Sequence, residues 1–230
     1  MRTISAIGFD LDGTLFDHAG SASIAAGRFA EHLGVVAADE FRECWFEAEH
    51  IEFERWRSGE ITFEEQRRGR LRRVLPAFGL PVPEEDAALD ALYAEFLFEY
   101  RAAWEAFPDS APALRLARSH GLRIGVLTNG SEAQQFEKLR EIGLIELIDV
   151  VCTSEGIGVQ KPDRRAFETL ADRLGVPADE CVFIGDHPEH DVAGAIAAGM
   201  RGVLVERTAD DATALLRLVE DALSGLRPRV

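Results

Sequence analysis

Residues 9–14 read FDLDGT and end an apolar segment with two carboxylates that lie two residues apart. The residues from Ile4 to Phe9 predict a short buried strand, and Gly13 predicts a turn directly after it. Because side chains alternate along a strand, Asp10 and Asp12 can point the same way. Two such acids can divide catalysis, one as a nucleophile and one moving protons. For this pattern taken alone, a strand end with two solvated carboxylates is the alternative.

Four more apolar segments predict strands in the second half of the chain. They span residues 123–127, 150–153, 181–184 and 202–205. Between them lie helical segments with apolar residues on one face, such as Ala166, Phe167, Leu170 and Leu174. Strands that alternate with helices predict a Rossmann-like α/β fold, with a parallel sheet covered by helices on both faces. We expect the first strand to join that sheet.

The segment between the first two strands has a different composition. It is charged, rich in aromatic residues and helical in its periodicity, with a capping box predicted at Thr62 and Glu65. We therefore predict a core of residues 1–16 and 104–230, with an all-helical cap inserted at 17–103. A last helix is predicted over 212–223, ending at Gly225.

A run of arginines lies within the predicted insert. Its members are Arg67, Arg68, Arg70, Arg72 and Arg73. The run can attract an anionic substrate, or it can form a solvated helix face paired with nearby glutamates.

The overall charge limits the classes of partner. The chain of 230 residues carries 41 acidic and 25 basic side chains, a net charge of −16. This argues against nucleic acid as a partner, since nucleic-acid binding relies on clustered Lys and Arg. No apolar run predicts a membrane span or a signal peptide, and the three widely spaced cysteines suit buried thiols in a reducing compartment. We therefore expect a cytoplasmic protein.

Two further motifs suit an anion. Thr128 and Asn129 end the second predicted strand, where a hydroxyl and a backbone N–H can face an anion and Gly130 eases the turn. An ordinary strand-to-helix turn also explains these residues. Lys161 precedes a helix that Asp163 can cap, and a lysine there can hold a phosphate oxygen as a point charge. A solvated surface lysine is the alternative.

The last motif suits a metal. Asp186 lies at the carboxyl end of an apolar strand, and Asp191 is predicted to open the following helix. Carboxylate oxygens suit Mg²⁺, which usually takes one or two protein carboxylates and keeps several waters. His187 and His190 lack a thiolate or a third histidine, so they are interpreted as loop residues and not as zinc ligands. An N-cap role alone explains Asp191 well but Asp186 less well.

Each of these motifs falls at or just past the end of a predicted strand. In an open parallel sheet the carboxyl ends share one edge, where ligands bind. On these motifs, in this order, the chain resembles the haloacid dehalogenase superfamily, in its phosphatase branch with a helical C1-type cap. The resemblance spans nearly the whole chain, although the predicted cap matches only in its helical character and its position.

The resemblance implies roles for these residues. Asp10 would be a nucleophile that forms an aspartyl-phosphate, and Asp12 would protonate the leaving oxygen and then activate water. Mg²⁺ would be held by Asp10, the backbone carbonyl of Asp12 and Asp186, with Asp191 orienting the site. The phosphoryl oxygens would be held by Thr128, the amide of Asn129 and Lys161.

The sequence thus predicts a Mg²⁺-dependent phosphomonoester hydrolase that acts on a small phosphorylated metabolite. A sugar-phosphate mutase of the same family remains an alternative, because such mutases keep an acid at the position of Asp12. A 2-haloacid dehalogenase is disfavoured, because that branch lacks this acid and uses no metal. A non-catalytic binding module is a fourth possibility. Neither the substrate nor the oligomeric state can be predicted from these residues.

Overall fold

The computed structural model describes residues 4–208 and 211–224, which fall into two compact units. The first unit combines the segment up to His18 with the segment from Trp104 onward, and the second spans Ala19–Ala103. We call them the α/β unit and the helical unit.

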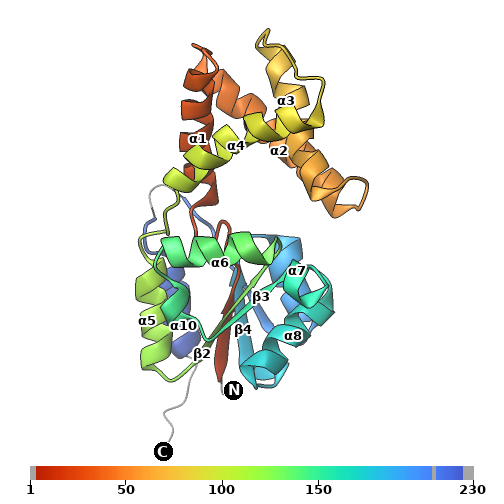
Figure 1. Ribbon diagram of the computed structural model, residues 1–230. Helices are drawn as coiled ribbons and strands as arrows, with labels where there is room; N and C mark the ends of the chain where they lie inside the picture. The colour runs from red at the N-terminus through yellow and green to blue at the C-terminus, as the bar shows by residue number, and fades with distance from the viewer. Residues whose placement is uncertain (1–3, 209–210, 225–230) are drawn as a thin grey trace, which may run out of the picture. The chain divides into compact units, whose positions relative to one another are not determined.

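The α/β unit is built on a sheet of five parallel strands (Figure 1). Their order in the sheet is β3-β2-β1-β4-β5. The strands are β1 (Ala6–Phe9), β2 (Arg123–Thr128), β3 (Val150–Thr153), β4 (Cys181–Gly185) and β5 (Arg201–Leu204). The predicted parallel sheet is confirmed, and the first strand occupies its centre.

Strand boundaries differ from the predictions by one or two residues. The first strand begins at Ala6 and not at Ile4, because its ladder to both neighbours pairs only Ala6–Phe9. The backbone N–H of Asp10 still donates to the carbonyl of Ile184 at 2.9 Å, so Asp10 is held at the edge of the sheet.

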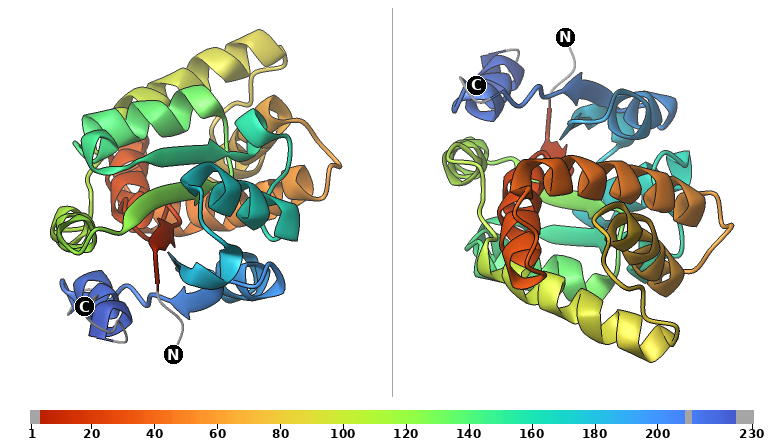
Figure 2. Two further views of the ribbon diagram at one scale, coloured as in Figure 1. Left: turned by 90° about the horizontal axis from the view of Figure 1, so that it is seen from below. Right: turned by 90° about the horizontal axis from the view of Figure 1, so that it is seen from above.

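Helices cover both faces of the sheet, as predicted (Figures 1 and 2). On one face lie α5 (Ser110–Ser119) and α10 (Ala214–Ser224), and on the other lie α8 (Arg164–Leu174) and α9 (Gly194–Ala197). The remaining helical elements of this unit are α6 (Glu132–Glu141), η1 (Ile145–Leu147), α7 (Ser154–Ile157), η2 (Ala178–Glu180) and the π-helical turn η3 (Pro188–Ala193). The predicted end of the last helix at Gly225 lies outside the described residues.

The core between the sheet and α8 is tightly packed. The rings of Phe167 and Phe183 meet edge to face, with centroids 5.0 Å apart. Leu170 approaches the sheet so closely that a Cβ on Gly125 would lie 2.7 Å from its side chain. This packing anchors the central strands and therefore their carboxyl ends.

Four helices form the helical unit, and no strand occurs in its described residues. They are α1 (His18–His32), α2 (Ala38–Arg57), α3 (Phe63–Ala77) and α4 (Asp86–Ala102). The capping box at the start of α3 is confirmed, with Thr62 and Glu65 bonded reciprocally. An aromatic core holds the helices together, in which the rings of Phe29 and Phe96 lie 5.6 and 4.4 Å from Trp45.

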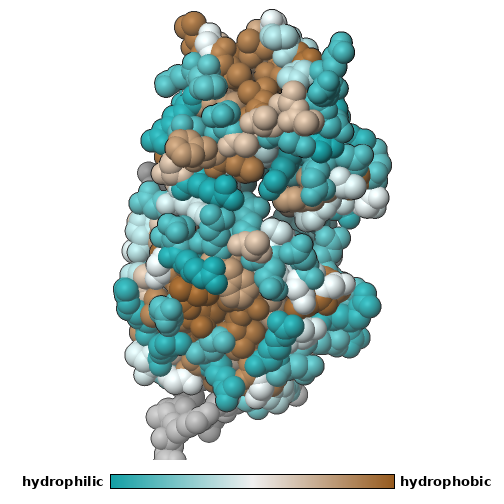
Figure 3. All heavy atoms as spheres, viewed as in Figure 1, coloured by the Kyte–Doolittle hydropathy of each residue, from teal (hydrophilic) through white to brown (hydrophobic). Residues whose placement is uncertain are grey.

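On the surface of the helical unit, apolar atoms lie over α1 and α4 on the face seen in Figure 3. Within the described ranges, no helix has both the length and the apolar character needed to cross a bilayer. The cysteines are free thiols. Cys152 and Cys181 are buried as expected, whereas Cys44 is only half-buried because it lies on the partly exposed helix α2.

Candidate active site

The predicted motifs lie at one edge of the sheet. Asp10 directly follows β1, Thr128 ends β2 and Asp186 directly follows β4. Because β1 lies between β2 and β4, these three residues belong to neighbouring strands. The chain runs outward from β1 through β2 to β3 and then returns to β4 on the other side of β1. Such a switch in direction leaves a crevice at the carboxyl ends of the strands, where α/β proteins bind ligands.

Gly13 shapes the turn that follows β1. Its φ of +86° lies in the left-handed region that favours glycine. A Cβ on Gly13 would also lie 2.4 Å from Oδ2 of Asp186, so the glycine allows this carboxylate to approach the loop. The Thr14 hydroxyl donates to Oδ1 of Asp186 over a long 3.4 Å. The loop after β1 and the loop after β4 are thus in contact.

Lys161 lies at the centre of a cluster of carboxylates. Its ammonium donates to Oδ1 of Asp191 at 2.6 Å and also to Oδ1 of Asp10, and all three side chains are buried. Asp186 joins them at the solvent-exposed side, and the carboxylates of Asp10, Asp186 and Asp191 offer ligand atoms within 4.8 Å of one another. Three carboxylates around one ammonium leave an excess of negative charge when all are ionised.

The pKa values reflect this crowding. Burial raises the pKa of Asp10 well above its ordinary value; Lys161 opposes that rise, while Asp191 and Asp186 add to it. Partial burial and then the charge of Asp191 raise the pKa of Asp186, although its side chain still reaches solvent. For Lys161, burial disfavours the charged form, but the carboxylates of Asp10 and Asp191 outweigh it and raise the pKa. A divalent cation would relieve the repulsion among the carboxylates, so the donor set fits Mg²⁺.

Asp191 does not open a helix, and that prediction was wrong. The N-cap of η3 is His187, whose Nδ1 accepts from the backbone N–H groups of Glu189 and His190 at 3.2 Å each. Asp191 lies inside η3, where its Oδ2 accepts the backbone N–H of His187 at 2.9 Å. A Cβ on Gly185 would lie 2.4 Å from the Asp191 side chain, so this glycine lets η3 turn the carboxylate inward.

The interpretation of the two histidines as loop residues is only half right, because His187 is the N-cap of η3 whereas His190 lies inside that helical turn. Among the described residues, the cluster placed to hold a metal consists of carboxylates and includes neither His187 nor His190. Their rings lie 3.8 Å apart, next to the cluster.

The residues predicted to bind phosphate are tied together by their own hydrogen bonds. The Asn129 side-chain amide donates to the backbone carbonyl of Lys161 at 3.0 Å, and its oxygen accepts the Lys161 N–H at 2.9 Å. Thr128 is buried and its hydroxyl accepts from Gln135 at 2.9 Å. The side chain of Asn129 therefore fixes the Lys161 loop against the end of β2.

Asp12 meets partners that the sequence analysis did not identify. Its Oδ2 accepts from Nε2 of Gln135 at 3.0 Å, and its Oδ1 accepts from Nζ of Lys138 at 2.5 Å. Burial opposes ionisation of Asp12, but the charges of Lys138 and His18 outweigh it and lower the pKa. Asp10 and Asp12 thus have separate sets of partners, because Asp12 lies in the loop beyond the strand, where the alternation of side chains no longer applies.

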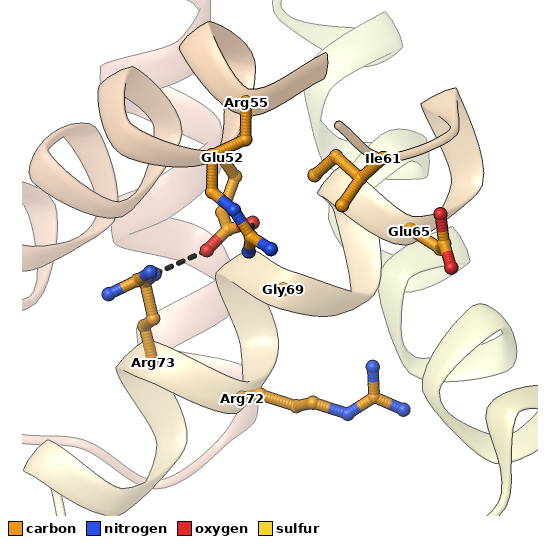
Figure 4. A pocket seen from close by; sticks show the side chains of 7 residues that line it. All are labelled: Glu52, Arg55, Ile61, Glu65, Gly69, Arg72 and Arg73. Atoms are coloured by element: carbon orange, nitrogen blue, oxygen red, sulfur yellow. Dashed lines mark hydrogen bonds and ion pairs between the residues drawn. The ribbon is translucent and has the colours of Figure 1, made fainter. Parts of the chain in front are cut away.

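Arginines of the run in the helical unit form ion pairs with aspartates and with a glutamate. Arg68 bonds Asp90 and Asp86, whereas Arg70 is buried and bonds Glu49 at 2.6 Å. The run is therefore not a purely solvated face. Helices α2 and α3 also line a cavity of about 320 Å³ with three arginines and two glutamates (Figure 4). Its lining is Glu52, Arg55, Ile61, Glu65, Gly69, Arg72 and Arg73.

Comparison with known proteins places the chain in a family. A family model described as haloacid dehalogenase-like hydrolase matches residues 4–199. The glyceraldehyde 3-phosphate phosphatase of Methanopyrus kandleri is 32% identical over 208 residues, which cover 89% of this chain and 84% of that one. The ribulose-1,5-bisphosphate 5-phosphatase of Halopiger xanaduensis is 33% identical over 216 residues, which cover 91% and 88%. Matches to two further phosphatases span 55% and 46% of the relative's length.

Solved structures of the same fold include proteins named as phosphatases and proteins named as dehalogenases. A phosphatase from Thermococcus onnurineus superposes with a TM-score of 0.62 at 26% identity, over 97% of this chain and all of that one. A 2-haloacid dehalogenase from Pseudomonas syringae superposes with a TM-score of 0.64 at 28% identity, over 96% and 100%. The two relatives above that match over most of its length are named phosphatases, and the chain belongs to the haloacid dehalogenase-like hydrolase family.

Proposed function

We propose that the chain is a Mg²⁺-dependent phosphomonoesterase that acts on a small phosphorylated metabolite through an aspartyl-phosphate on Asp10. The observation that carries this proposal is the carboxylate cluster, in which Asp10 and Asp191 share the ammonium of Lys161 and Asp186 adds a third carboxylate. A cation would neutralise this excess charge, and a cation with an ammonium beside it can neutralise a phosphoryl group.

Asp10 is the nucleophile in this proposal. One of its carboxylate oxygens attacks phosphorus, the P–O bond to the leaving group breaks, and a phosphoryl-aspartate forms. Water then attacks the same phosphorus, which releases inorganic phosphate and restores the carboxylate. Two displacements on one nucleophile split a difficult hydrolysis into two easier steps.

Asp12 moves the protons in both steps. It gives a proton to the leaving oxygen in the first step and takes one from the attacking water in the second. Its lowered pKa favours the carboxylate that the second step needs. A bound phosphate dianion beside it raises the pKa of a carboxyl group, which favours the protonated form for the first step.

The other residues of the edge hold the substrate. In this proposal the phosphoryl oxygens are bound by Thr128, Asn129 and Lys161. The bond of Lys161 to Asp10 and the bond of Asn129 to the Lys161 backbone support these roles. Asp10, Asp186 and the backbone carbonyl of Asp12 would hold Mg²⁺, with Asp191 supporting them. When bound, the ion supplies positive charge that stabilises the phosphoryl group in the transition state.

The names of two relatives and the predicted domain organisation support the proposed substrate class. Both full-length relatives reported above are named for small sugar or triose phosphates. We propose that residues 17–103 serve as the cap that selects the leaving group, and that the enzyme acts in the cytoplasm, consistent with its free cysteines.

The test is phosphate release from p-nitrophenyl phosphate and from a panel of metabolite phosphates, with Mg²⁺ or with EDTA. The panel includes glyceraldehyde 3-phosphate, ribulose 1,5-bisphosphate, phosphoglycolate and nucleoside monophosphates. We expect release that requires both Mg²⁺ and Asp10, so that Asp10→Asn is inactive. The control Asp172→Asn, which neutralises an exposed carboxylate on α8, keeps full activity. Metal-independent release, or activity in Asp10→Asn, contradicts the proposal.

The named dehalogenase among the structural neighbours makes a second activity worth testing. Chloride release from a 2-haloacid without metal, together with no phosphate release, would favour a dehalogenase. Sugar-phosphate isomerisation that is faster than phosphate release would favour a mutase. The absence of all three activities would favour a binding module.

A further inference from the structure

Helix α6 brings two buried polar side chains to the catalytic edge. It begins at Glu132, three residues after Asn129, and carries Gln135 and Lys138 one turn apart on the same face. Both side chains are buried, with relative exposures of 3% each. Neither belongs to the motifs by which the sequence was interpreted.

Gln135 is oriented by the active-site residues around it. Its Nε2 lies within hydrogen-bond distance of Oδ2 of Asp12 (3.0 Å), Oγ1 of Thr128 (2.9 Å) and the carbonyl of Asn129 (3.2 Å). Its Oε1 is buried and has no hydrogen-bond partner among the described residues. Leaving a buried acceptor unpaired costs about 1–3 kcal/mol. The Gln135 amide is therefore oriented so that Nε2 reaches the three acceptors around it, although this orientation leaves Oε1 without a hydrogen bond among the described residues.

Lys138 binds the other oxygen of the same carboxylate. Its Nζ lies 2.5 Å from Oδ1 of Asp12 and 4.8 Å from the centroid of the Phe16 ring. Asp12 therefore receives a different donor on each oxygen, both from one helix. Two donors on a planar carboxylate restrict its rotation as well as its position.

We propose that Gln135 and Lys138 are positioning residues. They hold the Asp12 carboxylate in a fixed position relative to Thr128 and Asn129, from which it carries out its proton transfers. This inference rests on the proposed function. Gln135 links Asp12 to Thr128 and Asn129, so the group that moves protons and the groups that hold phosphate share one support. Asp10 has its own ammonium partner in Lys161.

The chain has two lysines, and each bonds one acid of the proposed catalytic pair. It has 25 lysines and arginines together, of which Lys138 and Lys161 are the two lysines. Lys161 serves Asp10 and Lys138 serves Asp12. A lysine ammonium is a compact point charge that suits a single carboxylate oxygen, whereas the arginine guanidinium is a wider fork of five donors.

The experiment compares Lys138→Met and Gln135→Met with matched controls from the same helix. Methionine keeps the approximate length of both side chains and removes their donors. The controls are Arg140→Met, which removes an exposed cation two residues further on, and Gln134→Met, which removes the neighbouring amide. Melting temperatures establish that all four variants are folded.

The kinetic readout separates positioning from a structural role. An alkyl phosphate has a poor leaving group that needs a proton, whereas p-nitrophenolate leaves without one. We expect kcat/KM for an alkyl phosphate to fall by about tenfold to a hundredfold, the usual cost of misplacing a catalytic group by about 1 Å. With p-nitrophenyl phosphate, we expect a burst of one p-nitrophenolate per site followed by slow turnover, because Asp12 no longer activates water well. The controls keep wild-type behaviour.

An equal loss on both substrates without a burst, or unchanged kinetics in both variants, overturns the inference. Crystal structures of wild type and Lys138→Met provide a readout that is independent of activity. We expect the Asp12 carboxylate to turn away from its wild-type position in the variant, and an unmoved carboxylate contradicts the inference. If the wild type releases no phosphate but the carboxylate turns as expected, the proposed function fails while the positioning role of Lys138 stands.

Discussion

The two units of the molecule treat buried charge differently. In the α/β unit, Asp10 and Asp191 share the single ammonium of Lys161, and Asp186 adds a third carboxylate. In the helical unit, the buried carboxylate of Glu52 bonds Arg55 at 2.9 Å and also bonds Arg73. Figure 4 shows the guanidinium of Arg73 directed at this carboxylate.

The difference indicates which charges serve function. Buried ions are stable in a fold when opposite charges and hydrogen bonds balance them, as they do around Glu52. An uncompensated cluster is costly and is retained where a ligand supplies the missing charge. The same criterion applies to Arg70, which is buried but bonded to Glu49 and Gln66, and it assigns that residue to structure.

The largest expected effect comes from removing the only ammonium in the cluster. Lys161→Met leaves two buried carboxylates without their partner, so we expect the free energy of unfolding in EDTA to fall by about 3 kcal/mol. We expect phosphatase activity to fall by about 10²- to 10³-fold, because a donor to the phosphoryl group is lost. Denaturant unfolding and steady-state kinetics measure both.

Asp10→Asn is the matched variant in the same cluster. It removes one of the repelling carboxylates and keeps the bond between Lys161 and Asp191, so we expect no loss of stability in EDTA. Mg²⁺ should restore part of the stability that Lys161→Met loses, since a ligand that binds only the folded state stabilises it. If Asp10→Asn destabilises the protein as much as Lys161→Met does, the charges of the cluster compensate one another. The two units then do not differ in how they treat buried charge.

A smaller effect is expected in the helical unit. Glu52→Gln removes a buried carboxylate that bonds two arginines, and we expect a loss of about 1–3 kcal/mol in the free energy of unfolding. Glu60→Gln removes an exposed carboxylate, 57% accessible, that bonds Arg55 as well, and we expect little change. Denaturant titration of both variants provides the comparison. Equal effects would show that burial does not decide the contribution of these ion pairs.

The smallest effects concern one helix cap in each unit. Thr62→Ala removes the hydroxyl that accepts from the Glu65 N–H in the capping box of α3 and should cost about 1 kcal/mol, with little dependence on pH. Asp163 caps α8, and its bonds with the Arg165 side chain and backbone lower its pKa to about 2. This contribution is fully present above the unfolded pKa of about 3.9 and is lost as the pH falls through about 2.

Unfolding of Asp163→Ala and Thr62→Ala at several pH values between about 4 and 2 measures this difference. As the pH falls, we expect the difference in the free energy of unfolding between wild type and Asp163→Ala to shrink. We expect the corresponding difference for Thr62→Ala to stay constant. A gap for Asp163→Ala that does not change with pH would contradict the assignment of its charge to the cap.

Much of the α/β unit could be predicted from local patterns. The five strands were located to within two residues, because buried parallel strands are short apolar runs with turn residues after them. The carboxylates at 10 and 186 were singled out as polar groups where apolar strands end, and the lysine at 161 as a cation just before a capped helix. Their assigned roles are still predictions, which the variants above test.

The errors and omissions concern residues inside helices. Asp191 was expected to cap a helix, but it lies within a π-helical turn whose cap is His187. Gln135 and Lys138 were not identified as site residues, although the scarcity of lysine was a signal that could have found the second. A polar residue in a helix is usually solvated, and only its neighbours in the fold show otherwise.

The sequence by itself determined the type and order of the elements and which acids follow strands, because these depend on periodicity over a few neighbouring residues. Only the tertiary structure decided which charges meet. Lys161 reaches Asp10 across 151 positions of the chain and Gln135 reaches Asp12 across 123. Both contacts exist because β1 lies between β2 and β4, and this order results from how the whole sheet packs and not from any local pattern.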